Sequence, residues 1–204
     1  MIKTKDLILR DFIESDIKKR IYWEKVETEW QLWDAPWEYE GLTEEEQQEE
    51  LDGYVDTMYK WVERYREMSD EQKRYMFQLA TNDEEQRYIG WVTSYNIDDE
   101  YNYTDENGHC TVGIDIPDMS VRGKGYPYQA LCAFIKYLIN HGEKDIYTQT
   151  WSGNERMIHV AERMGFEECC RKKGIRSVRG GTYDGLTFKL NKHAFNSFCE
   201  KILG

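Results

Sequence analysis

The feature that most constrains this chain is the loop at residues 122–127, which reads RGKGYP between an expected strand and an expected helix. Apolar side chains alternate at Val112, Ile114 and Ile116 before the loop and recur at helical spacing over residues 128–140 after it. Two glycines let the loop backbone curl, and the first amides of a helix have no partner within it, so together they form a site for an anion. This unit predicts a pyrophosphate-binding turn; the alternative is an ordinary strand-to-helix connection.

Pro127 lacks an N–H group and removes one donor from this turn, although its fixed φ suits the first turn of a helix. We therefore expect the helix to begin at its usual place, with a slightly altered phosphate site. The remaining backbone donors expected for a phosphate are those of Gly123, Lys124, Gly125, Tyr126 and Tyr128.

A second motif follows at residues 154–166, NERMIHVAERMGF, in which an Asn opens an expected helix that ends at Gly-Phe. In this order the two motifs resemble those of the GNAT superfamily of acyl-CoA-dependent N-acetyltransferases. The superfamily's pyrophosphate loop reads Gln or Arg, two residues, Gly, one residue, then Gly or Ala. Arg122 and Gly125 match the first two fixed positions, and Pro127 departs at the third. Residues 7–10, LILR, resemble the first strand of the branch that contains ribosomal-protein alanine acetyltransferases, so the resemblance covers nearly the whole chain.

The resemblance implies an α/β (α+β) fold, with a mixed, mostly antiparallel central sheet, a splayed strand pair and flanking helices. The residue pattern agrees, because a capping box at Thr43 precedes a helical apolar stripe over residues 51–65. Two strands are expected at residues 75–81 and 88–97. With 204 residues, 40% hydrophobic content and three prolines, a single GNAT-type domain over residues 1–204 is expected.

The net charge of −12 argues against a nucleic-acid partner and favours cationic ones. Five cysteines form no Cys-x-x-Cys pair and no spaced metal set, and the odd count fits reduced thiols in a cytosolic protein. The first residues lack the apolar core of a secretory signal, and no stretch approaches the roughly 20 apolar residues that span a bilayer. We expect a cytoplasmic protein without membrane or metal partners, as a monomer or a homodimer.

The resemblance implies that the cofactor is acetyl-CoA. Its pantetheine arm would lie beside the strand that ends near Ile116, and its pyrophosphate would bind the loop. It also implies that Asn154 bonds the cofactor, while the alternative role of this residue is a helix N-cap. The residues expected to bind acetyl-CoA are Ile116, Met119, Val121, Arg122, Gly123, Lys124, Gly125, Tyr126, Tyr128 and Asn154.

Attack of an amine on a thioester requires an unprotonated nitrogen, so a base is needed to remove the proton of the ammonium group. Asp115 is the candidate base, because burial in an apolar strand raises a carboxyl pKa toward the working range; the alternative is an exposed or salt-bridged Asp. A backbone N–H near Ile116 is the expected donor to the oxyanion. Ala161 stands where many family members have a Tyr acid, which leaves Tyr183 and His159 as candidates. An acid is not essential, because a thiol of pKa about 8.5 leaves readily as a thiolate.

The acceptor site is expected among interleaved tryptophans and carboxylates, with Trp33, Asp34 and Trp37 as one wall, since both groups attract ammonium ions. The alternative is a solvated acidic surface with tryptophans in the core. We expect an acetyl-CoA-dependent N-acetyltransferase that acts on a primary amine, either a protein N-terminus or a small cationic amine. The alternative is a non-catalytic acyl-CoA sensor or scaffold, because Pro127, Met157 and Ala161 depart from the family pattern.

Overall fold

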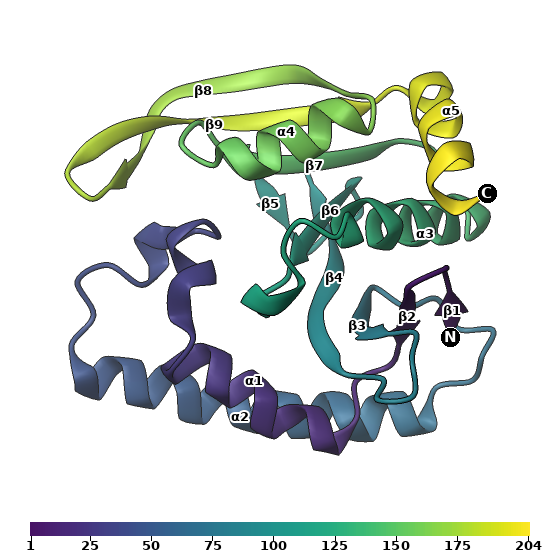
Figure 1. The fold of residues 1–204 in the computed structure, drawn as a ribbon. Helices are drawn as coiled ribbons and strands as arrows, with labels where there is room; N and C mark the ends of the chain where they lie inside the picture. The colour runs from purple at the N-terminus through teal and green to yellow at the C-terminus, as the bar shows by residue number, and fades with distance from the viewer.

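A computed structural model describes residues 1–204 as a nine-stranded sheet with helices on both faces (Figure 1). The strands are β1 (Ile2–Lys3), β2 (Leu7–Arg10), β3 (Met76–Thr81), β4 (Tyr88–Ile97), β5 (Tyr103–Thr104), β6 (His109–Asp115), β7 (Ile146–Trp151), β8 (Phe166–Val178) and β9 (Gly181–Leu190). The helices are α1 (Glu14–Lys25), α2 (Glu44–Glu67), α3 (Tyr126–Asn140), α4 (Glu155–Arg163) and α5 (Lys192–Leu203), with short 3-10 helices η1 (Thr28–Leu32), η2 (Pro36–Glu38) and η3 (Met119–Val121). None of the helices has both the length and the apolar composition that crossing a bilayer requires.

The sheet has the order β1-β2-β3-β4-β6-β7-β9-β8, with β5 beside β4. Every neighbouring pair is antiparallel except β6 and β7. These two strands pair only at Cys110 with Ile146 and at Thr111 with Tyr147, and they diverge beyond that point. The predicted mixed, mostly antiparallel sheet with a splayed strand pair is therefore confirmed.

Gly90 on β4 allows the end of β6 to approach its antiparallel neighbour closely. A Cβ at this position would lie 2.1 Å from the Asp115 carbonyl oxygen and 2.9 Å from the Ile116 Cα. The pairing of β3 with β4 also shifts register here, between Leu79 and Ala80, which is typical of a β-bulge. The end of β6 thus follows β4 and turns away from β7, and this leaves the gap beside Asp115.

The two faces of the sheet carry separate hydrophobic clusters. The larger cluster packs α3, α4 and α5 against one face and includes the buried rings of Phe77, Phe134, Phe188 and Phe195. Each fully buried ring of this kind contributes about 1.5–3 kcal/mol to folding. On the other face, Phe12 joins α1 and α2 in a small cluster, and these two helices lie side by side in Figure 1.

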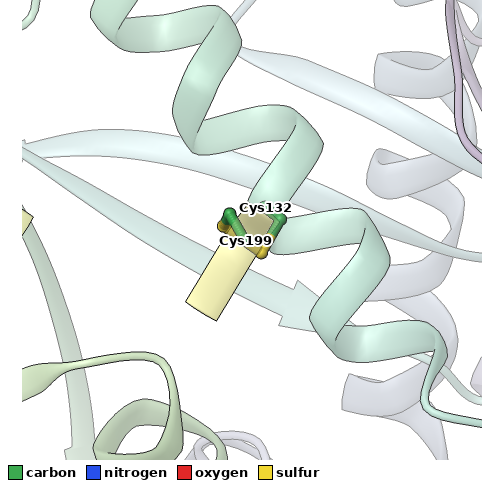
Figure 2. Close-up of a disulfide and its surroundings, with 2 residues drawn as sticks. All are labelled: Cys132 and Cys199. Atoms are coloured by element: carbon green, nitrogen blue, oxygen red, sulfur yellow. A yellow bond between two sulfur atoms is a disulfide. The ribbon is translucent and has the colours of Figure 1, made fainter. Parts of the chain in front are cut away.

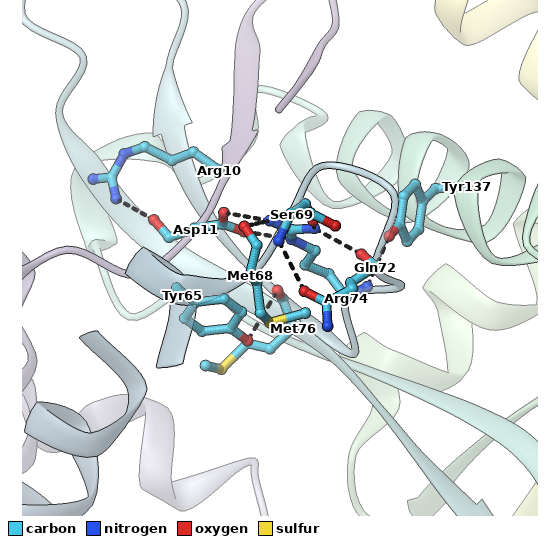
Figure 3. A network of polar contacts seen from close by, with 9 residues as sticks. All are labelled: Arg10, Asp11, Tyr65, Met68, Ser69, Gln72, Arg74, Met76 and Tyr137. Atoms are coloured by element: carbon cyan, nitrogen blue, oxygen red, sulfur yellow. Dashed lines mark hydrogen bonds and ion pairs between the residues drawn. The ribbon is translucent and has the colours of Figure 1, made fainter. Parts of the chain in front are cut away.

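A polar network centred on Arg74 holds the connection between α2 and β3 (Figure 3). The Arg74 guanidinium donates to both carboxylate oxygens of Asp11, at 3.3 and 3.2 Å, and to the carbonyl oxygens of Ser69 and Gln72. The Arg74 backbone N–H donates to the Tyr137 hydroxyl on α3 at 2.7 Å. Because Arg74 is 6% exposed, these acceptors satisfy a charge that would otherwise be costly to bury.

Cys132 on α3 and Cys199 on α5 form a disulfide, with Cα atoms 5.7 Å apart (Figure 2). Both cysteines are fully buried, and they close a loop of 67 residues. The expectation that all five thiols are reduced is therefore wrong, since spacing along the sequence does not show which helices the fold packs together. The thiol count consequently gives no support to a cytosolic location.

Changing Gly90 to Ala puts a Cβ into the space of the Asp115 carbonyl oxygen, so we expect the free energy of unfolding to fall by about 1–3 kcal/mol. The control is Gly53→Ala on α2, where nothing lies within 4 Å of the added Cβ and alanine favours the helix by about 0.5–1 kcal/mol. Urea unfolding measures both changes. Wild-type stability in the Gly90 variant would show that this contact does not shape the end of β6.

Candidate active site

A cleft of about 570 Å³ opens where β6 and β7 diverge, and we refer to it as the splay cleft. One wall consists of the end of β6, the loop after η3 and the start of α4. The other wall is the segment at residues 29–37, which contains most of η1 and the start of η2. The cleft therefore joins the two sequence motifs to the tryptophan-rich segment, although these are far apart along the chain.

The loop at residues 122–127 has the geometry of a phosphate-binding turn. Gly123 and Gly125 have φ angles of +75° and +74°, in the left-handed region that favours glycine. The amides of residues 123–126 donate no hydrogen bond within the protein, whereas the Tyr128 amide donates to the Gly125 carbonyl at 3.2 Å. Pro127 lies in the first turn of α3, as its fixed φ predicts. The free amides fit a pyrophosphate, and Tyr128 contributes no free amide to it.

Two arginines beside this loop are paired with one carboxylate. Glu29 on η1 accepts from Arg122 and lies 3.2 Å from Arg156 on α4, whose guanidinium lies 3.9 Å from the Trp33 ring centroid. Partial burial tends to raise the pKa of Glu29, but hydrogen bonds from Arg122 and Trp33 and the charge of Arg156 lower it overall. Glu29 thus holds the 29–37 segment against the two cations that a phosphate would also attract.

Asn154 is the N-cap of α4 and also holds the same segment. Its Oδ1 accepts from the Met157 amide at 3.0 Å, and its Nδ2 donates to the Trp33 carbonyl at 2.9 Å. Trp151 Nε1 donates to that carbonyl as well, at 2.8 Å. Asn154 therefore has the alternative role, that of a helix cap. A cofactor that contacted the same side-chain atoms would compete with these bonds.

Asp115 and Asp34 lie in the splay cleft, and the structure perturbs the pKa of both carboxyl groups. Burial raises the pKa of Asp115 well above its usual range, and the negative charge of Asp34 adds to this, while Arg20 and Trp91 oppose it. Asp34 is exposed at the surface, yet desolvation by the protein around its carboxyl group and the charge of Glu38 raise its pKa to about 6, again opposed by Arg20. Each of these two neighbouring carboxyl groups therefore holds its proton more tightly than a solvated Asp does.

The Ile116 backbone N–H, directly after β6, donates no hydrogen bond within the protein. Ile116 lines the splay cleft beside Asp115. Acyl transfer uses two such groups: a carboxyl group of raised pKa to accept the proton, and a free N–H beside it to stabilise the oxyanion.

The structure brings most of the predicted site residues into this cleft. Those that line it are Trp33, Asp34, Trp37, Asp115, Ile116, Val121, Arg122, Gly123 and Asn154. Gly125 and Tyr126 form the start of α3 beside it, while Met119 and Lys124 are exposed. Tyr128 packs against Phe198 on α5, and Tyr183 packs edge-on against Trp151, with ring centroids 5.4 and 4.9 Å apart. Neither tyrosine is among the lining residues.

Three functional side chains were not expected from the sequence. Glu29 and Arg156 lie in the cleft through an ion pair between segments that are 127 residues apart. Arg20 is buried on α1, where its guanidinium lies 3.0 Å from the Trp91 ring centroid and donates to the Tyr88 hydroxyl at 3.0 Å. Arg20 is three residues from both Ile17 and Trp23, which are buried, so the helical spacing places it on the buried face of α1. A sequence pattern alone nevertheless assigns a cation at such a position to the solvent-exposed surface.

The family model for an acetyltransferase (GNAT) domain matches residues 6–167. Because this match covers most of the chain, the chain belongs to the GNAT acetyltransferase family. This confirms the predicted family, its N-acetyltransferase class and the acyl-CoA type of its donor. A comparison with curated proteins finds no match.

Several solved structures with a similar fold are acetyltransferases. A GNAT-family acetyltransferase from Bacillus anthracis is 16% identical, with a TM-score of 0.63 over 94% of this chain and 98% of that chain. The spermidine N-acetyltransferase of Vibrio cholerae, in complex with CoA and spermine, is 16% identical, with a TM-score of 0.64 over 93% and 98%. The ribosomal-protein α-N-acetyltransferase RimL, in complex with CoA, is 18% identical, with a TM-score of 0.60 over 91% and 94%. At these identities the likeness establishes the fold.

Changing Gly125 to Val places a β-branched side chain at a φ of +74°, so we expect the loop to lose its shape and CoA affinity to fall about tenfold or more. Gly142→Val is the matched control, because Gly142 has a φ of +99° and equally open space but follows the other end of α3. Calorimetric titration with CoA measures both. An unaltered affinity in the Gly125 variant would contradict the assignment of this loop to the pyrophosphate.

The raised pKa of Asp34 makes a prediction about stability. The folded protein holds this proton up to about pH 6, whereas the unfolded chain releases it near 3.8, so the wild type loses stability relative to Asp34→Asn as pH rises through that interval. We expect the variant to have the higher Tm at pH 7 and a similar Tm at about pH 3.5. Asp56→Asn, an exposed position on α2, is the control. A difference in Tm that is constant with pH would contradict the shift.

Proposed function

We propose that residues 1–204 form one GNAT-type domain that transfers an acetyl group from acetyl-CoA to a primary amine, either a protein N-terminus or a small cationic amine. The observation that carries this proposal is the position of Asp115. Its carboxyl group lies at the end of β6, in a cleft that also contains the loop with free amides and the free Ile116 N–H. An anion site, a base and an oxyanion donor thus share one cleft.

The residues present fit the donor. The free amides of residues 123–126 suit the pyrophosphate, and Arg122 adds a positive charge beside it. The gap between β6 and β7 leaves the backbone near Ile116 open for a pantetheine arm. Acetyl-CoA supplies the thioester: the amine nitrogen bonds to its carbonyl carbon, the C–S bond breaks, the nitrogen loses a proton and the thiolate leaves.

The protein supplies the proton acceptor and the oxyanion donor. Asp115 takes the proton from the incoming amine, and its raised pKa brings it closer to the pKa of the group that it deprotonates. The Ile116 N–H stabilises the negative charge that develops on the carbonyl oxygen. Tyr183 packs against Trp151 away from the cleft lining, so we assign it no step, and the thiolate leaves without an acid.

Changing Asp115 to Asn tests the base. We expect kcat to fall about 100-fold, with CoA affinity intact. In the wild type the rate should rise with pH as Asp115 loses its proton, and the variant should lack this limb. Release of CoA thiol across pH, against a panel of amines, measures both. Asp145→Asn is the control, because this half-exposed carboxylate pairs with Lys189 and does not line the cleft.

Each outcome of this experiment decides one point. Wild-type rates in the Asp115 variant at every pH would remove Asp115 from the mechanism. Tight CoA binding by the wild type without thiol release from any amine would favour the sensor or scaffold, in which Pro127 and Met157 line the cleft without a catalytic role.

A further inference from the structure

A second cavity, of about 1030 Å³, lies on the α1 and α2 side of the end of β6, and we refer to it as the acidic cavity. It shares three lining residues with the splay cleft, namely Trp30, Asp34 and Asp115. Its other walls come from α1, the 28–42 segment, the first half of α2 and Trp91 on β4. The two cavities therefore meet at the proposed base, and a molecule in the acidic cavity reaches Asp115 without crossing the phosphate loop.

Carboxylates dominate the lining of the acidic cavity. They are Glu24, Asp34, Glu38, Glu44, Glu50 and Asp115. Only two cations line it, and both are engaged: Lys25 donates to Gln48 at 2.6 Å, and Arg20 lies 3.9 Å from Glu24. The other five carboxylates form no ion pair. Because Glu38, Glu44 and Glu50 have no cationic partner in the protein, they leave uncompensated negative charge along this cavity, and this charge favours a ligand with more than one positive charge.

Aromatic side chains complete the walls. Trp30, Tyr39, Tyr54 and Trp91 line the cavity, and Trp30 packs edge-on against both Tyr39 and Trp91. Aromatic faces attract ammonium groups and accommodate the methylene chains between them. A linear aliphatic amine meets both needs, whereas an anionic ligand would be repelled.

Arg20 marks the inner end of the cavity. It is 4% exposed, and its Nε has no hydrogen-bond acceptor in the protein. An ammonium group has no lone pair to accept this N–H, so a protonated amine beside Arg20 would leave it unsatisfied. The Arg20 charge also disfavours an ammonium ion beside it. Positive charge at the inner end and unpaired carboxylates farther out thus favour a neutral nitrogen inside and a charged one outside.

We propose that the acidic cavity binds an acceptor with two or more amines, such as a linear polyamine, with the reacting nitrogen beside Asp115 and a further ammonium group among Glu38, Glu44 and Glu50. This inference rests on the proposed acetyl transfer and names its acceptor class. A second ammonium group gains attraction that a monoamine lacks, and this gain weakens with added salt because the outer carboxylates are exposed. A protein N-terminus is the competing acceptor.

The first experiment compares acceptors that differ in the number of amines. Pentylamine, cadaverine and spermidine are offered to the wild-type protein with saturating acetyl-CoA, and CoA thiol release is measured. We expect the KM for cadaverine to be about tenfold lower than the KM for pentylamine, and the KM for spermidine to be lower than that for cadaverine. The difference between the KM values of the monoamine and the polyamines should shrink in high salt.

The second experiment changes the outer carboxylates. The double variant Glu44→Gln with Glu50→Gln should raise the KM for spermidine about tenfold more than the KM for pentylamine. The matched control is Glu45→Gln with Glu49→Gln, two exposed glutamates of the same helix that do not line the cavity. Calorimetric titration of spermidine into each protein with CoA present measures the same site without turnover.

The outcomes separate this inference from the proposed function. Equal kcat/KM for pentylamine and spermidine, or equal effects of the two double variants, would overturn the polyamine site and leave acetyl transfer standing. A peptide N-terminus acetylated in preference to spermidine would do the same. Absence of thiol release with every acceptor would overturn acetyl transfer, and spermidine titration would then decide the cavity alone: loss of binding only in the Glu44 and Glu50 variant supports it, and equal binding overturns it.

Discussion

The close approach of β6 to β4 at Gly90 is the constraint on which the rest of the structure depends. Because no side chain separates these strands, the Asp115 carbonyl lies where a Cβ would otherwise be, and the end of β6 follows β4. β7 loses its partner β6 after Tyr147 and stays paired with β9 along its other edge. The missing side chain at Gly90 thus lets the end of β6 stay beside β4 where β7 has diverged, and the Ile116 N–H directly after β6 has no acceptor in the protein.

The charges around this gap are segregated. Arg122 and Arg156 lie on the side of the phosphate loop, where Glu29 pairs with both, and most of the unpaired carboxylates lie on the side of α1 and α2. Arg20 lines only the acidic cavity, buried against Trp91, and it opposes the rise in the pKa values of Asp34 and Asp115. A chain with a net charge of −12 thus keeps positive charge beside the loop proposed to bind the anionic donor, and negative charge in the cavity proposed to bind a cationic acceptor.

Much of the fold and part of the site could be predicted from local patterns. The bounds of β4, the capping box before α2 and the free amides of the loop follow from alternation, Thr-to-Glu spacing and glycine geometry, which involve residues close in sequence. The disulfide and the position of Tyr183 could not be predicted in this way. Both depend on which helix or ring packs against which, and no short-range pattern encodes that packing.

The sequence by itself determined that residues 123–126 leave their amides free, because glycine at positive φ and proline in the first turn of a helix are properties of those residues alone. It also determined the family, through two motifs in order. Only the tertiary structure decided that Asp34 lies beside Asp115, that Glu29 pairs with both arginines, and that a second cavity meets the first at Asp115. The physical reason is that these contacts are set by the long-range packing of α1 and α2 on the sheet, and the pKa of a carboxyl group depends on the neighbours which that packing provides.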